Sequence, residues 1–285
     1  MYINIQKPIL DQNDRLAADI KEQARVHHIY LLDLLASPGA GKTSLILATI
    51  AALRHRYRIA VIEGDIASQV DAQKIKDAGI PAVQINTGGI CHLEARMILR
   101  ALDVLDLPNL DMIIIENVGN LVCPTDFYLG EDAKAMILSV PEGHDKPLKY
   151  PGVFQVARAV VLNKIDTLNA FDFDERQFAE DIHQLNPQAP VFPLSATTAR
   201  GLDAWTQWLD AQIQCKTSAS ALVDSQTRAP ASSTTPDTSP APAPAPPLVP
   251  PSSSGSLAPA SSSPPASSLA FVPTPPFYKE PSCSL

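Results

Sequence analysis

The apolar residues of this chain fall into short runs, and these runs alternate with amphipathic segments. The apolar runs predict strands at the segment that begins with Leu31 and at 58–62, 82–85, 111–116, 133–140, 156–163 and 191–194. The amphipathic segments predict helices at 44–53, 71–78, 91–105, 174–185 and 201–213. Strands that alternate with helices and are apolar on both faces are typical of a parallel sheet with helices on both sides. The predicted fold is therefore an α/β three-layer sandwich with a mostly parallel sheet.

The composition divides the chain into three parts. Residues 1–28 form a polar, helix-prone lead-in, and residues 29–215 carry the alternating strands and helices. Residues 216–285 contain most of the chain's 27 prolines in a background of Ser, Ala and Thr. Such a segment cannot bury enough apolar surface to offset the entropy cost of ordering, so we predict a disordered tail. Its FVPTPPFYKE stretch is either a docking peptide or part of an idle tail.

The segment Leu31–Leu45, LLDLLASPGAGKTSL, has the order strand, small-residue turn, helix start that a phosphate-binding P-loop needs. Backbone N–H groups of such a loop, together with the helix N-terminus, hold phosphate oxygens. Ala36 stands where the usual motif has its first glycine, which is tolerable if that residue keeps a negative φ. The alternative is a chance Gly/Ser loop. The predicted nucleotide-binding residues are Pro38, Gly39, Ala40, Gly41, Lys42, Thr43 and Ser44.

A second motif predicts that the base is guanine. Asn163-Lys164-x-Asp166 follows an apolar strand, and a carboxylate at Asp166 can accept hydrogen bonds from both N1–H and the N2 amine of guanine. Adenine lacks that pair of donors and would leave the acid unpaired. Asn163 would brace the loops and the Lys164 stem would lie along the base. Ser195-Ala196, after the last predicted strand, fits a backbone contact to the guanine O6.

Acidic residues follow the strands where GTP hydrolysis needs metal and water. Glu116 ends the strand DMIIIE and Asp65 ends RIAVIEGD, with Asp71 six residues further on. We predict that Thr43, Asp65 and Glu116 hold Mg²⁺, and that Lys42, Asp65, Asp71 and Glu116 form the catalytic set. Each acid has the alternative of an ordinary solvated acid. This alternative is strongest for Asp71, because Asp is favoured in the first turn of a helix.

Charge and hydropathy exclude several other classes of function. The net charge is −8 and the pI about 5.2, so nothing suggests binding to nucleic acid or to anionic lipid. No apolar run reaches the roughly 20 residues of a membrane span. The N-terminus MYINIQKPIL lacks the features of a signal peptide. A cytoplasmic protein with no membrane or nucleic-acid partner is expected.

A candidate metal site consists of Cys91 and His92, which follow Gly88-Gly89, and Cys123, which follows the acid-ending strand. Both segments come after strands, so both are expected at the carboxyl edge of the sheet beside the nucleotide. Thiolate and imidazole donors suit Ni²⁺ or Zn²⁺, and a symmetric dimer can complete a site of three donors. The spacing alone leaves the alternative of buried, inert cysteines open.

Six blocks of this sequence together resemble the HypB/UreG family of nickel-insertion GTPases, specifically its hydrogenase-maturation branch. They are ASPGAGKT, IEGDIASQVDAQKI, GGICHLEARM, IIENVGNLVCPTDFYLGE, SVPEGHDKPLKYPGVF and LNKID. The resemblance spans about residues 1 to 213. It implies a GTPase that dimerises on GTP and binds nickel or zinc through Cys91, His92 and Cys123 at the dimer interface. The implied partners are the nickel chaperone HypA and the [NiFe]-hydrogenase large subunit.

The chain departs from the family in two respects, and two other functions remain open. It has no N-terminal Cys-rich or His-rich stretch, and the Pro/Ser tail is not part of the family pattern. A urease-type nickel GTPase has a Cys-Pro-His motif, whereas Thr125 follows Cys123-Pro124 here. A metal-dependent structural dimer with incidental GTPase activity is the other alternative. Lys146 or Lys149 either contacts the nucleotide or partner, or is an ordinary surface lysine.

Overall fold

The computed structural model describes residues 6–65 and 75–227, with side chains for 10–64 and 75–218. Seven parallel strands form one sheet in the order β3-β2-β4-β1-β5-β6-β7. The strands are β1 (Tyr30–Ala36), β2 (Ile59–Asp65), β3 (Ala82–Asn86), β4 (Met112–Glu116), β5 (Ala133–Ser139), β6 (Ala159–Asn163) and β7 (Val191–Pro193). This parallel sheet confirms the predicted α/β fold.

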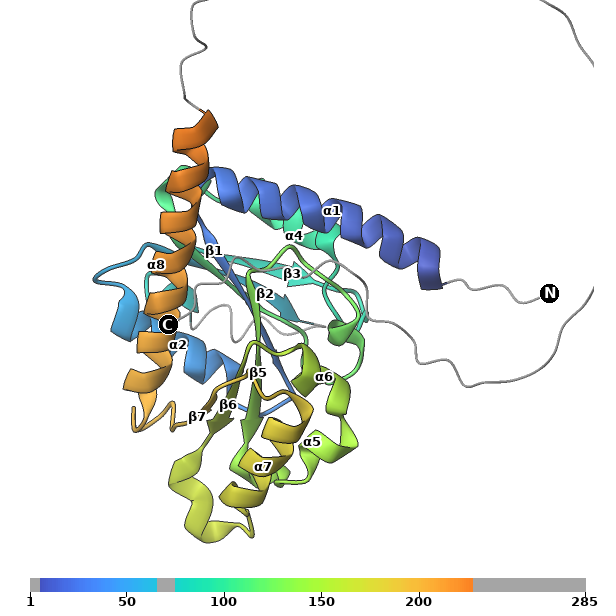
Figure 1. Cartoon of the computed structure of the whole chain (residues 1–285), viewed down its shortest axis with the longest axis vertical. Helices are drawn as coiled ribbons and strands as arrows, with labels where there is room; N and C mark the ends of the chain where they lie inside the picture. The colour runs from blue at the N-terminus through green and yellow to red at the C-terminus, as the bar shows by residue number, and fades with distance from the viewer. Residues whose placement is uncertain (1–5, 66–74, 228–285) are drawn as a thin grey trace, which may run out of the picture. The chain divides into compact units, whose positions relative to one another are not determined.

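Helices cover both faces of the sheet (Figure 1). They are α1 (Gln6–Val26), α2 (Lys42–Leu53), α4 (Ala95–Leu102), α5 (Lys146–Lys149), α6 (Pro151–Val156), α7 (Glu175–Leu185) and α8 (Leu202–Thr227). One face packs against α2 and α8 through a cluster that contains Leu34, Ile50 and Trp205. The opposite face packs against α1 and α4 over one half of the sheet and against α6 and α7 over the other half. These are the three layers that the sequence predicts.

The alternation of side chains along β1 explains why its run of apolar residues is continuous. Leu32 and Leu34 point into the core beneath α2 and α8, while Leu31 packs with α1 and α4 on the other face. All seven residues of β1 are buried. A central parallel strand is covered on both sides, so both of its faces must be apolar. The P-loop follows the carboxyl end of β1, so a fully buried strand anchors its start.

The N-terminal segment is a long helix that belongs to the folded body. Ala17, Ile20 and Ala24 of α1 are buried in the same cluster as Ile98 of α4, and Figure 1 shows the two helices side by side. These three apolar residues thus form the buried face of α1. Most of the outward residues are polar, as expected for a helix that covers a sheet.

Several predicted element boundaries differ from those in the structure. The predicted strand 156–163 begins only at Ala159, because α6, which has Pro151 at its first position, occupies the chain as far as Val156. The predicted boundary at 216 falls inside α8, which continues to Thr227. Lys216 is held there by an ion pair of 2.5 Å with Asp132. The remainder of the predicted tail, from 228 on, lies outside the described residues.

Within the described ranges, no helix combines the length and the hydropathy needed to cross a membrane.

Candidate functional site

The P-loop joins the end of β1 to the start of α2. Gly39 and Gly41 adopt left-handed backbone conformations, with φ of 79° and 95°, and Gly41 is the N-cap of α2. A Cβ atom on Gly41 would lie 2.5 Å from Asn163 Nδ2, so glycine is required there for both backbone and space. Ala36 lies inside β1, outside the left-handed region, so its methyl group causes no strain. The irregular position of the motif is therefore an ordinary strand residue.

Asn163, the last residue of β6, connects three loops. Its Nδ2 donates to the carbonyl of Ala40 at 2.9 Å, and its Oδ1 accepts from the backbone N–H of Lys164 at 2.8 Å and of Ala196 at 3.1 Å. The side chain is buried. The P-loop, the Asn-Lys-x-Asp loop and the Ser-Ala loop are thus fixed relative to one another by one amide, as the sequence predicts for Asn163.

The other residues of the predicted base site lie on the two loops that Asn163 connects to the P-loop. Lys164 has a left-handed backbone with φ of 62°, and its Nζ donates to the carbonyl of Gly39 at 2.7 Å. Asp166 is exposed at the start of the 3-10 turn Ile165–Ala170. Ser195 is buried, and its hydroxyl accepts from Thr198 N–H at 3.2 Å. The backbone at Ser195-Ala196 is therefore held rigidly at this edge of the sheet.

Oxygen donors gather on the α2 face of the sheet next to Thr43. The hydroxyl of Thr43 donates to Glu116 Oε1 at 3.0 Å. Glu63 of β2 is paired in register with Glu116 of β4, and both are buried. Hydroxyl and carboxylate oxygens are the donors that Mg²⁺ prefers, so this set fits the ion. Asp65 ends β2 but its side chain lies outside the described part, and Asp71 lies outside it entirely.

Cys91 and His92 lie in a loop, which corrects the prediction that a helix begins at Cys91. Helix α4 begins at Ala95, with the extended residue Glu94 as its N-cap. The preceding residues form a turn in which Gly88 and Gly89 have φ of 63° and 97°. A right-handed helix cannot include residues with these positive φ values. The helix therefore starts at Ala95, four residues after the predicted start at Cys91. We call residues 87–94 the first metal loop.

Cys123 is brought to the same place by the connection between β4 and β5. We call residues 117–132 the second metal loop, in which Cys123 opens a 3-10 turn. The Sγ atoms of Cys91 and Cys123 are 3.1 Å apart, and His92 Nδ1 is 3.9 Å from Cys91 Sγ. One ligand atom from each of the three residues lies within 4.8 Å of the others. The structure therefore brings together the three residues that the sequence nominated as metal ligands.

Comparison with known proteins assigns the family. The nucleotide-binding domain of the CobW/HypB/UreG family matches residues 33–193. The hydrogenase maturation factor HypB of Azotobacter vinelandii is 46% identical over 210 residues, which are 74% of this chain and 69% of that protein. This chain belongs to the HypB family. The hydrogenase/urease maturation factor HypB of Helicobacter pylori strain J99 is 42% identical over 211 residues, 73% of this chain and 86% of that protein.

A solved structure of the HypB family has the same fold. The crystal structure of HypB from Helicobacter pylori in complex with nickel superimposes with a TM-score of 0.68 at 40% sequence identity. It covers 71% of this chain and 95% of the other chain. The P-loop fold class and the family resemblance predicted from the sequence are thereby confirmed.

The candidate ligands of this HypB-family chain have shifted pKa values. The hydrogen bond with Cys123, followed by burial, raises the pKa of the Cys91 thiol. Burial lowers the pKa of His92, although the charges of Glu94 and Asp126 oppose that shift. His92 Nε2 is buried and has no hydrogen-bond partner among the described residues. A neutral imidazole and two nearby thiols form a donor set that suits a soft metal ion, which must displace the thiol protons to bind.

Aromatic and apolar contacts hold the first metal loop in place. The His92 ring stacks on Phe127 of the second metal loop, with 3.9 Å between ring centroids. Leu93 is fully buried against β2, where a Cβ atom on Gly64 would lie 2.7 Å from it. The glycine at position 64 thus leaves the space that Leu93 fills. Phe127, which stacks on the His92 ring, and the buried Leu93, which follows His92 in the sequence, together fix the position of His92.

Two asparagines connect the metal loops to each other. Asn117 Oδ1 accepts from Leu93 N–H at 3.2 Å, and Asn120 Nδ2 donates to the carbonyl of Cys91 at 3.1 Å. Asn117 directly follows Glu116, which contacts Thr43 of the P-loop. Gly119 also packs against the P-loop, since a Cβ atom there would lie 3.1 Å from the Pro38 ring. The nucleotide site and the metal loops are therefore in direct contact.

A buried ionic network of Lys134, Asp33 and Glu131 contacts the second metal loop. Lys134 Nζ lies 3.0 Å from Asp33 Oδ2 and 3.1 Å from Glu131 Oε1, and it donates to the carbonyl of Phe127 at 3.0 Å. Asn117 Nδ2 donates to Asp33 Oδ1 at 3.1 Å. Burial opposes the charge of Lys134, but attraction by Glu131 and Asp33 outweighs it, and the net effect raises the pKa of Lys134. The ammonium group is thus charged at neutral pH.

Lys146 and Lys149 make local contacts on α5. Lys149 forms an ion pair with Asp145, and Lys146 lies over the ring of Tyr150, 5.4 Å from its centroid. Their predicted role at an interface or nucleotide stays a prediction.

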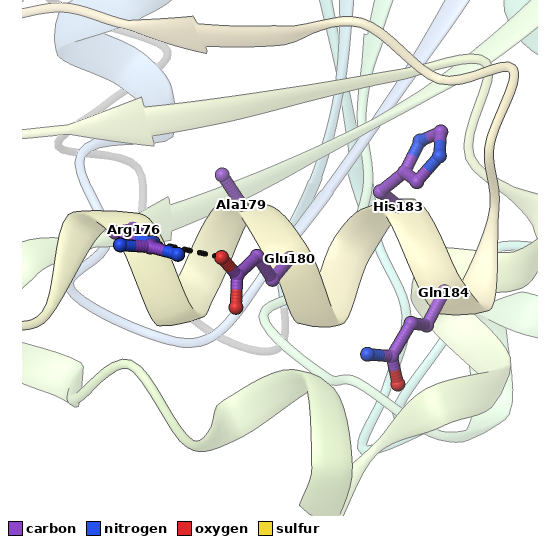
Figure 2. A pocket seen from close by; sticks show the side chains of 5 residues that line it. All are labelled: Arg176, Ala179, Glu180, His183 and Gln184. Atoms are coloured by element: carbon purple, nitrogen blue, oxygen red, sulfur yellow. Dashed lines mark hydrogen bonds and ion pairs between the residues drawn. The ribbon is translucent and has the colours of Figure 1, made fainter.

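The surface hollow drawn in Figure 2 is separate from these sites. It has a volume of about 380 Å³, and all five residues around it, from Arg176 to Gln184, come from α7 and are exposed. Arg176 and Glu180 form an ion pair along that helix, as the dashed line in Figure 2 shows. None of the predicted site residues lines it.

Sequence reasoning missed several residues that shape the site. Glu63, Asn117, Asn120, Asp33 and Lys134 are the clearest cases. For Asp33 and Lys134 the signal was available, because each is a charged residue inside a strand that is otherwise apolar on both faces. Charged residues are rarely buried unless they are paired, so two of them on predicted core strands indicate a buried ion pair.

Proposed function

We propose that this chain is a GTP-hydrolysing nickel metallochaperone for the maturation of [NiFe]-hydrogenase. The observation that carries the proposal is the convergence of Cys91, His92 and Cys123 beside a P-loop, with the ligand atoms within 4.8 Å of one another. The relatives named HypB, one of them solved in complex with nickel, support the same assignment. In this scheme nickel is the ion that is delivered, and the binding and hydrolysis of GTP control the affinity of the site for it.

The nucleotide site supports binding and hydrolysis of GTP. Lys42 would contact the phosphates, and Thr43 and Glu116, together with Asp65, would hold Mg²⁺. The ion, when bound, neutralises charge on the transferred phosphoryl group. The Thr43–Glu116 hydrogen bond of 3.0 Å supports this because it aligns both oxygen donors before the ion arrives. Asp71 remains the candidate to orient water.

Guanine recognition rests on Asp166 and on the loops around it. Asp166 would accept from N1–H and the N2 amine of the base. The buried amide of Asn163 supports the assignment, since it fixes the P-loop and both base loops before the nucleotide binds. Preorganised loops lose less entropy on binding, and this favours affinity.

The nickel site would use the two thiolates and one imidazole, with remaining ligands from the second protomer of a dimer. Three donors per chain leave a tetrahedral or planar site incomplete, so a symmetric dimer is the simplest way to fill it. Two exposed apolar side chains close to Cys123 support such a dimer. Val122 directly precedes Cys123, and Val156 lies on α6, which contacts the 3-10 turn of Cys123.

Coupling between GTP and metal would pass through the second metal loop. Glu116 and Cys123 are only seven positions apart in the sequence. Thr43 contacts Glu116, and Pro38 packs against Gly119. A change in the P-loop on GTP binding or hydrolysis would therefore shift the backbone that carries Cys123. The HypA chaperone and the hydrogenase large subunit would deliver and receive the metal.

A titration with Ni²⁺ tests the proposal. Wild type and Cys91→Ala are titrated in the presence of GDP and of a non-hydrolysable GTP analogue, and affinity and stoichiometry per dimer are measured. We expect Cys91→Ala to lose tight binding, and the wild type to bind differently in the two nucleotide states. Equal binding by wild type and mutant would refute the metal site. Equal affinity and stoichiometry with the two nucleotides would refute the coupling.

The two alternatives are separated by what drives dimerisation and by what accepts the metal. Sedimentation of the chain with Zn²⁺ alone and with GTP alone identifies a metal-dependent structural dimer if only Zn²⁺ produces dimers. A urease-type role predicts nickel transfer to apo-urease rather than to the hydrogenase large subunit.

A further inference from the structure

Helix α1 forms hydrogen bonds to the second metal loop and to the residue that directly follows the first metal loop, and both bonds come from one side chain. Asn13 Oδ1 accepts from the backbone N–H of Ala95, the first residue of α4, at 2.9 Å. Its Nδ2 donates to the carbonyl of Tyr128 at 2.7 Å. Ala95 directly follows the first metal loop, and Tyr128 belongs to the second one. Asn13 is thus a bridge between the chain segments that carry His92 and Cys123.

Asparagine is the residue that satisfies both partners. One partner is a backbone donor and the other a backbone acceptor, so the side chain must present one acceptor and one donor side by side. Asp offers no donor in its ionised form, and an apolar residue offers neither group. Asn13 is only 5% exposed, so water cannot replace the missing partner at low cost.

The backbone around Tyr128 is packed tightly against α1. Gly130 has φ of 81°, and a Cβ atom there would lie 2.6 Å from the carbonyl oxygen of Ala17 and 2.8 Å from Ile20. Phe127, next to Tyr128, stacks on His92 with 3.9 Å between centroids. Displacement of α1 would therefore move the aromatic support of His92 together with the loop that carries Cys123.

We propose that Asn13 is a positioning residue of the Cys91/His92/Cys123 metal site, and that α1 sets the distance between the two metal loops. The proposal rests on the metal site proposed above. Side chains that orient metal-binding groups from outside the ligand set typically change metal affinity about 10- to 100-fold when removed. A contact of this kind also gives anything that binds or displaces α1 a route to the metal.

The test uses Co²⁺ as a spectroscopic probe of the full-length, GDP-bound chain. Thiolate-to-Co²⁺ absorption reports how many sulfurs bind and in what geometry, independently of GTPase activity. We expect Asn13→Ala to weaken Co²⁺ binding about 10- to 100-fold and to lower the thiolate band of the bound ion, while GDP affinity stays unchanged. Asn13→Asp retains the acceptor for Ala95 but loses the donor to Tyr128. It should fall between wild type and Asn13→Ala.

Two control variants separate positioning from general destabilisation. Leu102→Ala opens the buried α1–α4 cluster at the last residue of α4, at the opposite end of that helix from Ala95, and should lower Tm but leave the Co²⁺ spectrum unchanged. Asp14→Ala changes the exposed neighbour of Asn13 and should change neither. An unaltered affinity and spectrum in Asn13→Ala would overturn the inference, as would an equal loss of binding in Leu102→Ala.

The Cys91→Ala variant separates this inference from the proposed function. If Cys91→Ala leaves the Co²⁺ spectrum unchanged, the metal site itself is wrong, and the positioning role falls with it. If Cys91→Ala abolishes the thiolate band and Asn13→Ala does not alter it, the metal site stands and only the role of Asn13 is refuted.

Discussion

The hydroxyl of Thr43 donates to Glu116 at 3.0 Å, and the next residue, Asn117, holds the first metal loop through Leu93. Two adjacent residues at the end of β4 thus face two sites, the P-loop on one side of the strand end and the Cys/His cluster on the other. A strand end is a rigid support, since β4 is buried along its whole length. We therefore expect a movement of the P-loop to reach the metal loops through this strand end.

The first prediction concerns the charge of Glu116. Glu116→Gln keeps an oxygen that can accept from Thr43, but it removes the negative charge that would hold Mg²⁺. We expect GTP hydrolysis to slow by about 10²- to 10³-fold, with Mg²⁺-independent GDP binding retained. Single-turnover hydrolysis and equilibrium GDP binding measure the two quantities. Glu180→Gln on exposed α7 is the matched control, and an unchanged rate in Glu116→Gln would show that Glu116 is not part of the catalytic set.

Much of the fold and of the nucleotide site follows from local sequence patterns. The apolar runs gave most of the strands to within a few residues, because a parallel strand buried on both faces must be continuous in apolar character. The P-loop and Asn163 follow from motifs whose residues lie close together in sequence. Asn163 connects loops as predicted because its amide has both a donor and an acceptor to share.

The metal loops depend on contacts that the sequence does not display. The helix predicted from Cys91 begins at Ala95, because the turn at Gly88-Gly89 and the hydrogen bond from Leu93 to Asn117 oppose a helical course. That hydrogen bond joins residues 24 positions apart. Asn13 is a stronger case, since a polar residue on a polar helix carries no signal of burial. Only the tertiary structure shows that it faces inward.

Coupling between the two sites is expected to depend on Asn117. Asn117→Ala removes the hydrogen bonds to Leu93 and Asp33 but leaves the Thr43–Glu116 contact intact. We expect the ratio of Ni²⁺ affinities in the GDP and GTP-analogue states to move towards one, while GTP affinity stays within about twofold. Isothermal titration in both nucleotide states measures the ratio.

The control for Asn117 is another asparagine that satisfies buried backbone. Asn186 donates to the carbonyl of Ala157 at 2.7 Å, and the two residues precede the amino ends of β7 and β6, whereas both sites lie at the carboxyl ends of the strands. Asn186→Ala should lower stability and leave the affinity ratio unchanged. If Asn117→Ala retains the full wild-type ratio, nucleotide and metal are coupled by another route.

Base specificity is expected to follow the hydrogen-bonding pattern at Asp166. Guanine presents two donors, N1–H and the N2 amine, whereas xanthine presents one donor and an acceptor at the same edge. Asp166→Asn replaces an acceptor pair by one acceptor and one donor, so GTP affinity should fall at least tenfold and XTP affinity should rise. Competition binding with GTP and XTP measures the change. A variant that still prefers GTP by the wild-type factor would place the base elsewhere.

The buried charge of Lys134 is expected to be essential for stability. Lys134→Met leaves Asp33 and Glu131 without their cation in a buried site, and breaking such a pair typically costs about 3–5 kcal/mol. Urea unfolding of the GDP-bound chain measures the loss. Lys146→Met removes a lysine from the short helix α5 and should change the unfolding free energy by no more than about 0.5 kcal/mol. Similar values for the two variants would contradict the network.

The pH dependence of the same network has a defined sign. The pKa of Lys134 is raised in the folded state from the ordinary value of 10.5. A group with a raised folded pKa contributes its full stability below the unfolded pKa and loses it as the pH rises through the folded pKa. The difference in unfolding free energy between wild type and Lys134→Met should therefore be constant from pH 7 to about pH 10 and decline only above that. A decline that begins near pH 8 would mean that Lys134 is not held as an ammonium ion between Asp33 and Glu131.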